Sequence, residues 1–222
     1  FTFSDLVGPG LPLFTPRGTL LRRLLEDFVQ SLQEPLGYQR VQIPHITKND
    51  LYKTSGHWDK FQEDPFHVRG QSGEEFCIKP MNCPHHTQIF ACRQRSYRDL
   101  PIRLSEVTSV YRDELPGALQ GLSRVRMITQ DDAHVFCTPE QIQAEFSLCL
   151  ELIREVLAAY QLTDYRVQLS LPAAEGQFAP DKVGVPPLGP RRDAVGGAGA
   201  DDRRDRLLHD GLFVLLGQVE RD

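Results

Sequence analysis

Apolar residues recur at helical spacing near the beginning of the chain. Thr15 can accept the hydrogen bond that caps a helix, and Pro16 suits a first turn, so a helix is expected to begin there. Its apolar positions are Leu20, Leu21, Leu24, Leu25, Phe28, Val29 and Leu32, whereas Arg22, Arg23, Glu26 and Asp27 fall on the other side. Gly37 ends this helix, and residues 38–43 then alternate as a half-buried strand that stops at Pro44.

A second helical pattern follows residue 138. Thr138 and Gln141 have the spacing of a capping box, and Pro139 lies between them in the first turn. The apolar positions that follow predict one buried stripe, made of Ile142, Phe146, Cys149, Leu150, Ile153, Val156, Leu157 and Tyr160. A further short strand is expected at residues 165–170.

The central part of the chain alternates as strands do. Residues 101–113 and 124–136 predict a hairpin, whose connection contains Gly117 and Gly121 and therefore has the backbone freedom it needs. Residues 47–75 are polar and irregular, and another hairpin is expected to lead into 76–79. A loop bounded by Pro80 and Pro84 then opens a helix that runs to about residue 95.

The composition changes after Ser170. Residues 171–222 are rich in Pro, Gly, Arg and Asp, which is typical of linkers and disordered segments, and only residues 207–219 could form a short ordered element. Two parts are therefore expected: a folded domain over residues 1–170 and a divergent tail over 171–222. The chain begins without Met, so it is expected to be a piece of a longer protein.

Composition excludes several classes of protein. A hydrophobic content of 40% and a charged content of 25% are ordinary for a globular domain, and a net charge of -5 means that RNA binding would need a local basic patch or a partner domain. No apolar run reaches the about 18 residues that cross a bilayer, and no secretion signal is present. Five scattered cysteines favour a reducing, cytoplasmic setting, and four of them, Cys77, Cys92, Cys137 and Cys149, are interpreted as core or surface thiols.

The hairpin at 101–136 carries the densest chemistry. Arg112, Arg124 and Arg126 lie on its two arms, and a guanidinium can bind two phosphate oxygens at once, so the hairpin predicts a cradle for a polyphosphate. Two adjacent carboxylates, at 131 and 132, would suit a cation. The alternative is a surface hairpin with solvated charges, which is the commoner fate of charged residues.

Three motifs give the chain a resemblance to a known family. They are Ile-Lys-Pro-Met-Asn-Cys-Pro at residues 78–84, Ser-Tyr-Arg-Asp-Leu-Pro-Ile-Arg-Leu at 96–104 and Thr-Gln-Asp-Asp-Ala-His-Val-Phe-Cys at 129–137. In this order they resemble the catalytic domain of the threonyl-tRNA synthetases, which are class II aminoacyl-tRNA synthetases, and the resemblance covers residues 1–170. It implies an α+β fold, an antiparallel sheet flanked by helices, that is incomplete towards its C-terminal end.

The resemblance also implies a metal site. Cys83 and His134 are similar to two of the three protein ligands of the family's zinc ion, whereas the third, a histidine, is not found, because the neighbours of His209 do not match. An open zinc position could bind the amino and hydroxyl groups of L-threonine and so separate it from valine, which an apolar pocket does poorly. Without the resemblance, the two residues would be interpreted as a buried thiol and an ordinary polar histidine.

The implied ATP site lies on the hairpin. Arg112 resembles the arginine that binds the α-phosphate beside the threonine carboxylate, Glu114 the residue that meets the adenine amino group, and Arg124 the contact to the γ-phosphate, with Mg²⁺ as the accompanying ion. Ile128, next to Met127, stands where the family commonly has an aromatic residue under the adenine. The alternative is a lattice of surface salt bridges.

Other residues are implied to bind threonine or tRNA(Thr). Gln130 and Asp132 resemble the residues around the amino and hydroxyl groups of threonine, and Met81 resembles part of the pocket wall. His57 corresponds to a histidine near the terminal ribose of the tRNA, although a loop histidine without a role is an equal alternative. Arg112, Gln130 and His57 are thus the expected catalytic residues.

Three further positions leave alternatives open. The helix and strand before Pro44 resemble the class II dimerisation element, which implies a homodimer, but any amphipathic helix before a strand would look the same. His85 replaces a family glycine and could be a spectator, a base or a stray ligand. Lys79 could reach tRNA or a phosphate, but a solvated side chain is expected.

The implied activity is that of a threonine–tRNA ligase, with ATP-dependent activation of L-threonine and its transfer to the 3′ end of tRNA(Thr). Because the third zinc ligand and the family's final ATP-binding arginine are missing, the isolated chain is expected to have weak or no activity. Two alternatives remain: a non-catalytic synthetase-like fragment or paralogue that acts as a dimerising or regulatory binding module, and a related adenylating enzyme for another amino acid.

Overall fold

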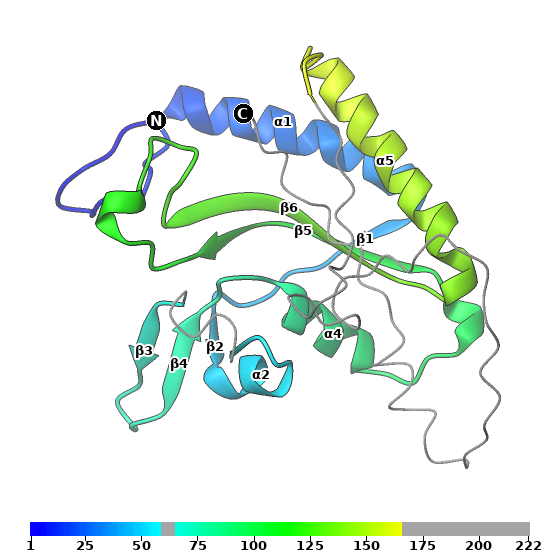
Figure 1. The fold of residues 1–222 in the computed structure, drawn as a ribbon, viewed down its shortest axis with the longest axis horizontal. Helices are drawn as coiled ribbons and strands as arrows, with labels where there is room; N and C mark the ends of the chain where they lie inside the picture. The colour runs from blue at the N-terminus through cyan, green and yellow to red at the C-terminus, as the bar shows by residue number, and fades with distance from the viewer. Residues whose placement is uncertain (59–64, 166–222) are drawn as a thin grey trace, which may run out of the picture. The chain divides into compact units, whose positions relative to one another are not determined.

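The computed structural model describes residues 1–58 and 65–165, and it mixes helices with short and long strands (Figure 1). The strand predicted at 165–170 and the tail at 171–222 lie outside the described residues, apart from Tyr165. Contacts divide the chain into two compact units. Among the described residues, the first contains those within Phe1–Arg93 and Ser105–Asp132, and the second contains Gln94–Leu104 and residues 133–165.

The first helix confirms the sequence prediction. Helix α1 spans Pro16–Gln33, and the Thr15 hydroxyl accepts a hydrogen bond of 3.4 Å from the backbone N–H of Gly18. A 3₁₀ turn, η1 (Glu34–Leu36), follows, and Gly37 ends it with φ of +82°, a conformation that side chains disfavour. Strand β1 (Tyr38–Arg40) is shorter than predicted.

The apolar stripe of α1 is largely exposed among the described residues. Leu20, Leu21 and Leu24 are 57%, 58% and 59% exposed, and Leu25 is 37% exposed. Gln33 is the residue of the helix that is buried. The first three turns of α1 therefore present leucines that the described residues do not cover.

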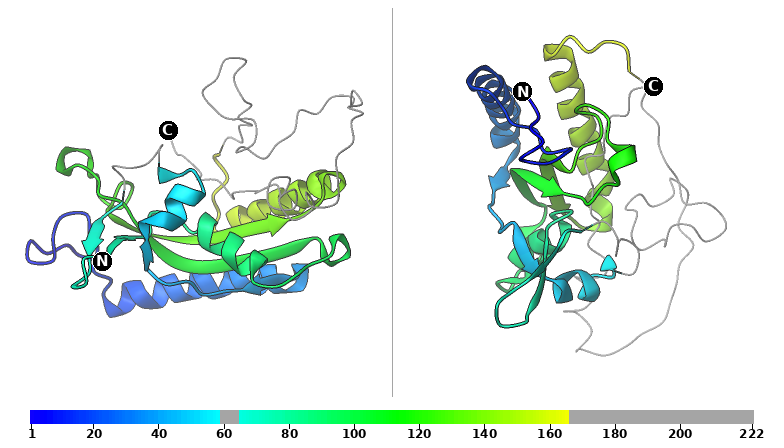
Figure 2. Two further views of the ribbon diagram at one scale, coloured as in Figure 1. Left: turned by 90° about the horizontal axis from the view of Figure 1, so that it is seen from below. Right: turned by 90° about the vertical axis from the view of Figure 1, so that its left-hand side faces the viewer.

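The predicted hairpin is confirmed. Strands β5 (Ile102–Tyr111) and β6 (Met127–Phe136) form a sheet with β1 in the order β1-β5-β6. The connection contains a 3₁₀ turn, η3 (Pro116–Ala118), and of its two glycines Gly121 has a positive φ, +48°. Figure 2 shows α1 running along one face of β5 and β6, while helix α4 (Cys83–Ala91) lies on the other.

A second, smaller sheet has the order β2-β4-β3. Its strands are β2 (Ile46–Lys48), β3 (His67–Arg69) and β4 (Glu75–Ile78), and both pairs are antiparallel. Helix α2 (Asn49–Thr54) follows β2 directly. The hairpin expected to lead into 76–79 is confirmed by β3 and β4. The prediction that 47–75 is irregular is wrong for β2 and α2, because a strand of three residues and a helix of six are too short to show a period.

The second unit contains helix α5 (Ile142–Ala159), with a 3₁₀ turn, η2 (Tyr97–Asp99), earlier in the chain. The predicted capping box is present at Thr138 and Gln141, although it opens another 3₁₀ turn, η4 (Pro139–Gln141), directly before α5. Of the predicted stripe, Cys149 and Leu157 are buried and the remaining members are partly exposed. The buried face also includes Leu152 and Glu145, and a hydrogen bond of 2.6 Å from Arg103 Nε to Glu145 Oε2 offsets the cost of burying that carboxylate.

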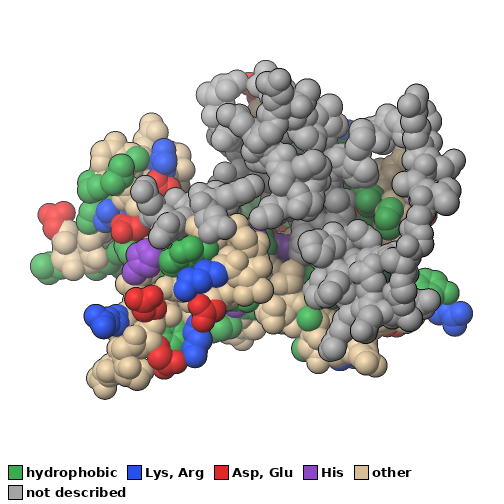
Figure 3. Space-filling model, turned by 60° about the horizontal axis from the view of Figure 1, so that its bottom comes forward, with side chains coloured by type: hydrophobic (Ala, Val, Ile, Leu, Met, Phe, Trp, Pro, Cys, Tyr) green, Lys and Arg blue, Asp and Glu red, His purple; other side chains and the backbone are tan. Residues whose placement is uncertain are grey.

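No helix in the described part of the chain combines the length and the apolar character of a membrane span. Figure 3 shows acidic and basic side chains intermixed on one face of the described residues, without a patch of one sign. Some of the charged side chains form ion pairs, such as that between Lys48 Nζ and Glu74 Oε1, 2.8 Å apart.

Candidate functional site

The loop between β4 and α4 is anchored by a buried lysine. Lys79 is fully buried, its backbone N–H donates to His45 and its carbonyl accepts from Tyr111, both at 2.9 Å. Its ammonium donates to Thr108 Oγ1 at 2.8 Å. The expectation of a solvated lysine is therefore wrong. Burial lowers the pKa of Lys79, and the negative charge of Glu106 opposes that shift.

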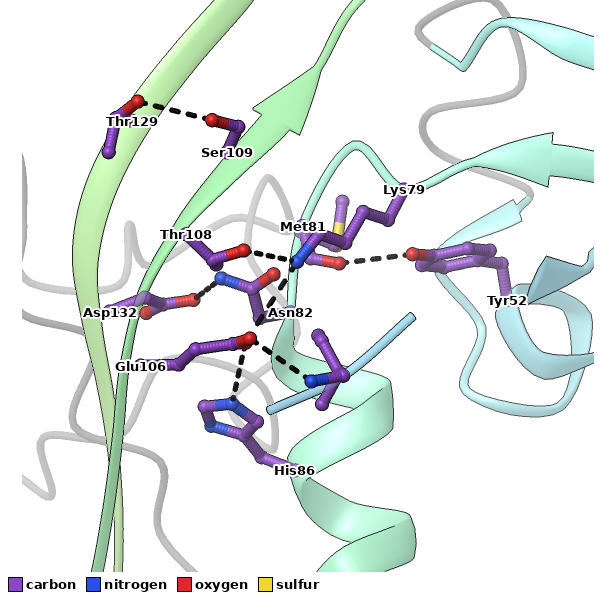
Figure 4. Close-up of polar contacts among 11 residues, drawn as sticks. Tyr52, Lys79, Met81, Asn82, His86, Glu106, Thr108, Ser109, Thr129 and Asp132 are labelled. Carbon is purple, nitrogen blue, oxygen red and sulfur yellow. Dashed lines mark hydrogen bonds and ion pairs between the residues drawn. The ribbon is translucent and has the colours of Figure 1, made fainter. Parts of the chain in front are cut away.

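Glu106 is the point where several segments meet. Its Oε1 accepts a hydrogen bond of 3.0 Å from the backbone N–H of Ile43, directly before Pro44. Its Oε2 lies 3.9 Å from Lys79 Nζ and 3.8 Å from His86 Nε2 on α4 (Figure 4). One buried carboxylate thus joins the end of the β1 segment, the loop and α4 to strand β5.

Two further residues of the same loop, Met81 and Asn82, are also held by hydrogen bonds. The Tyr52 hydroxyl donates to the carbonyl of Met81 at 3.0 Å, and burial raises the pKa of that phenol. The Asn82 amide donates to Asp132 Oδ2 at 2.7 Å, and both side chains are buried (Figure 4). Met81 and Asp132, two of the predicted threonine-binding residues, therefore belong to one connected wall. Sequence reasoning did not single out Tyr52, Asn82 or Glu106.

Alternation along β6 places further predicted residues together. Ile128, Gln130 and Asp132 are two residues apart, so they lie on one face of the strand, and His134 continues the series. Ile128 and Gln130 are partly exposed, whereas Asp132 and His134 are buried. The strand thus supplies a row of predicted adenine-binding, threonine-binding and metal-binding residues from one side.

Asp131 belongs to the opposite face. The amide of Gln33, at the end of α1, donates to its Oδ2. Burial raises the pKa of Asp131 to about 6, and the hydrogen bond from Gln33 opposes that shift. The suggestion that Asp131 and Asp132 together suit a cation is therefore wrong, because adjacent residues of a strand point to opposite faces.

Asp131→Asn is expected to stabilise the protein above pH 6. The pKa of Asp131 is raised from 3.8 in the unfolded chain to about 6 in the folded one, so stability falls as pH rises between these values. Asparagine keeps an acceptor for Gln33 without a charge. The free energy of unfolding should rise by about 1–2 kcal/mol at pH 7.5, after a discount for partial exposure.

Urea unfolding of the variant and its parent at pH 7.5 and at pH 4 measures this difference, which should shrink at pH 4. Asp5→Asn, at an exposed position, serves as the control and should show no such dependence on pH. An equal gain for Asp131→Asn at both pH values would contradict the assignment.

The arginines of the hairpin connection have different surroundings. Arg124 contacts the Glu114 carboxylate through Nε and Nη2, at 3.0 and 2.9 Å. Arg126 donates through Nε and Nη2 to the backbone carbonyl of Glu114, at 3.0 and 2.8 Å. The guanidinium of Arg112 has no polar protein partner among residues 1–58 and 65–165 and is partly exposed. Arg126 shapes the connection, and Arg112 has a guanidinium that can receive an anion.

His57 lies just after α2. Its backbone N–H donates to the carbonyl of Tyr52 at 3.0 Å, and its Nδ1 is 2.9 Å from Ser55 Oγ. The residue is partly buried and stands two positions before the undescribed segment 59–64. Its proposed role beside the tRNA stays a prediction.

Of the two proposed metal ligands His134 is fully buried and Cys83 is partly buried, and they belong to different units. Cys83 begins α4, where burial, together with the charge of Asp132, raises the pKa of its thiol to about 12. Burial lowers the pKa of His134 to about 4, so its imidazole is neutral. Thiolate and neutral imidazole suit Zn²⁺ chemically, but the described residues contain no group of three or more His, Cys, Asp and Glu that could hold a metal.

His85, which replaces the family glycine, is also buried. Neither ring nitrogen has a hydrogen-bond partner within the described residues, and its ring meets Tyr52 edge to face with centroids 6.1 Å apart. Burial, with a contribution from Lys79, lowers the pKa of His85 to about 4. It is therefore a neutral side chain at neutral pH.

Comparison with known proteins identifies the family of the chain. The family model of the tRNA synthetase class II core domain (G, H, P, S and T) matches residues 66–205, and the chain belongs to this family. Among curated proteins it is 51% identical over 174 residues to the threonine–tRNA ligase of Azobacteroides pseudotrichonymphae, covering 77% of this chain and 27% of the relative. It is 47% identical to the threonine–tRNA ligase of Synechocystis, covering 88% of this chain and 34% of the relative.

Solved structures give the same result. The RNA binding domain of threonyl-tRNA synthetase from Cryptosporidium parvum superposes with a TM-score of 0.69 at 41% identity, over 72% of this chain and 40% of that one. A prolyl-tRNA synthetase from Giardia lamblia, at 21% identity and a TM-score of 0.63 over 68% of this chain and 32% of that one, shows the fold alone. The α+β fold and the resemblance to the threonyl-tRNA synthetases are thus confirmed. The chain spans about a third or less of the length of these curated relatives.

Proposed function

We propose that this chain provides the threonine-binding and ATP-binding walls of a threonine–tRNA ligase. The observation that carries the proposal is the buried hydrogen bond between Asn82 and Asp132. It joins the loop that carries Met81 to the β6 face that carries Gln130 and Asp132, so the residues proposed to bind threonine come together.

The proposed reaction begins with activation of the amino acid. A carboxylate oxygen of L-threonine attacks the α-phosphorus of ATP, the bond to the pyrophosphate oxygen breaks, and threonyl adenylate and pyrophosphate form. The attack brings two anions together, so it requires fixed positive charge, which Arg112 and Mg²⁺ would supply. Gln130 and Asp132 would hold the amino and hydroxyl groups of threonine, with Met81 beside them.

The same proposal assigns the remaining ATP contacts. Glu114 would accept from the adenine amino group, Ile128 would pack against the base, and Arg124 would bind the γ-phosphate. Arg124 and Glu114 form an ion pair with each other, and Arg124 is 58% exposed in that pair, so it has room to turn towards a phosphate. In the second step the ribose hydroxyl at the 3′ end of tRNA(Thr) would displace AMP, with His57 nearby.

Zinc is part of the proposal on the strength of the resemblance and of two donor residues, the partly buried Cys83 and the buried His134. Cys83 and His134 would each supply one ligand, and the bound ion would select for an amino acid with a hydroxyl group. His209, whose sequence neighbours do not match those of the family's third ligand, lies outside the described residues. A cytoplasmic setting is proposed because all five cysteines that the structure describes are free thiols.

The decisive experiment is ATP–pyrophosphate exchange with the longest protein that carries this chain. We expect exchange that depends on threonine, and about one zinc ion per chain by elemental analysis. Exchange with serine or proline instead would identify another adenylating enzyme. A folded protein without exchange and without zinc would point to a binding module and would overturn the proposal.

A homodimer is proposed from the exposed stripe of α1. Leu20, Leu21 and Leu24 are each more than half exposed on consecutive turns, and apolar surface of this kind is typical of an interface. A second copy of the chain is the proposed cover.

Leu21→Glu combined with Leu24→Glu should convert the dimer to a monomer. Each glutamate would have to lose its hydration in the apolar interface, so the dissociation constant should rise by at least about a hundredfold. Analytical ultracentrifugation over a range of concentrations measures this. Arg23→Glu, on the charged side of the same helix, is the matched control and should stay dimeric.

A further inference from the structure

Asn82 lies in the motif that the sequence analysis singled out, although no role was assigned to it. Its side chain is fully buried, and its Nδ2 is 2.7 Å from Asp132 Oδ2. The neighbouring residues are fixed as well, because Met81 accepts from Tyr52 and Lys79 donates to Thr108. The amide of Asn82 is therefore presented to Asp132 from a rigid loop.

The chemistry of this contact is directional. An ionised carboxylate only accepts hydrogen bonds, so Asn82 must present its NH₂ group to Asp132. A donor fixed on one oxygen selects one orientation of the carboxylate plane, and a hydrogen bond to a charged acceptor is stronger than one between neutral groups. An aspartate at position 82 would fill the same volume but would place an acceptor against an acceptor.

Packing alone gives little reason for an asparagine here. Its Oδ1 is buried and has no hydrogen-bond partner among the described residues, which costs free energy that an apolar side chain would not cost. The benefit that offsets this cost is the bond to Asp132.

We infer that Asn82 is a positioning residue, which orients the Asp132 carboxylate towards the hydroxyl and amino groups of the substrate amino acid. The inference rests on the proposed function, because Asp132 is proposed to bind threonine. Asn82 acts through Asp132 and makes no contact with the substrate of its own. It should therefore affect the affinity for threonine and the preference for threonine over valine, but not the affinity for ATP.

The test uses Asn82→Asp in the longest protein that carries this chain, assayed by ATP–pyrophosphate exchange. The KM for threonine should rise about tenfold to a hundredfold, which is the loss expected for a hydrogen bond to a charged group, while the KM for ATP should change less than about twofold. The ratio of kcat/KM for threonine to that for valine should fall. Threonine binding measured by calorimetry gives the same comparison without turnover.

Asn49→Asp is the matched control. Asn49 is also buried, its Oδ1 also lacks a hydrogen-bond partner within the described residues, and it has no proposed role in binding. Its substitution should leave the KM for threonine unchanged. If Asn82→Asp fails to fold, Asn82→Ala replaces it, because alanine has no side-chain donor and removes the bond to Asp132 without adding a buried charge.

Asp132→Asn completes a double-mutant cycle. Asn82→Asp should cause no further loss of threonine affinity once Asp132 has been replaced, whereas a residue that only supports the fold would cause the same loss in both backgrounds. A parent protein without threonine-dependent exchange would refute the proposed function. An active parent whose Asn82 variants keep the KM for threonine would overturn this inference alone.

Discussion

Arg112→Ala should lower threonine-dependent ATP–pyrophosphate exchange about a hundredfold to a thousandfold, the usual effect of removing one preorganised charge from a transition state. The α-phosphate and the threonine carboxylate repel each other, and the guanidinium of Arg112 has no polar protein partner within the described residues that would compete for it. The loss should appear mainly in kcat, because charge develops on the α-phosphate during the attack.

Arg112→Lys should recover part of the activity, since an ammonium keeps the charge but loses the bidentate geometry. Arg93→Ala is the matched control: Arg93 is an exposed arginine after α4 with no proposed role, and its removal should leave exchange unchanged. If Arg112→Ala and Arg93→Ala have equal activity, Arg112 does not bind the reacting phosphate.

Glu106→Ala should cause the largest loss of stability. It would leave the Lys79 ammonium, which is fully buried, without its nearest negative charge, and it would remove the acceptor of the Ile43 N–H. Breaking a buried ion pair on one side costs about 3–5 kcal/mol. Unfolding in guanidinium chloride, followed by circular dichroism, measures the change.

Two comparisons separate the charge from the packing. Lys79→Met combined with Glu106→Gln removes both charges and keeps an acceptor for Ile43, so it should recover most of the lost stability. Glu74→Ala breaks the exposed pair with Lys48 and should have no measurable effect. A double variant no more stable than Glu106→Ala would show that the buried charge is not the cause.

The sequence predicted the long elements well. Thr15 and Pro16 located the start of α1, Thr138 and Gln141 the capping box before α5, and the alternating runs the β5–β6 hairpin. These signals are local, because each depends on residues a few positions apart. They could be read without knowledge of the fold.

The contacts that build the site depend on the tertiary fold and were not predictable in this way. Lys79 has the composition of a surface residue, and its burial depends on Glu106 and Thr108, which are distant in sequence. The exposure of the apolar face of α1 was equally unpredictable from the sequence, since an apolar stripe does not show whether the same chain or another one covers it. The family motif located Asn82, but only its 2.7 Å contact with Asp132 indicates a role.

Strand β6 carries two carboxylates that are adjacent in the sequence and lie on opposite faces of the strand. Asp131 contacts α1, and Asp132 contacts the loop before α4. Losing one residue between 127 and 130 would shift the strand by one position and exchange these two side chains between its faces. Changes of length in the 113–123 connection would leave that alternation intact. Insertions and deletions that leave Glu114 and Arg124 in place should therefore be tolerated in the connection, whereas those within β6 should be eliminated.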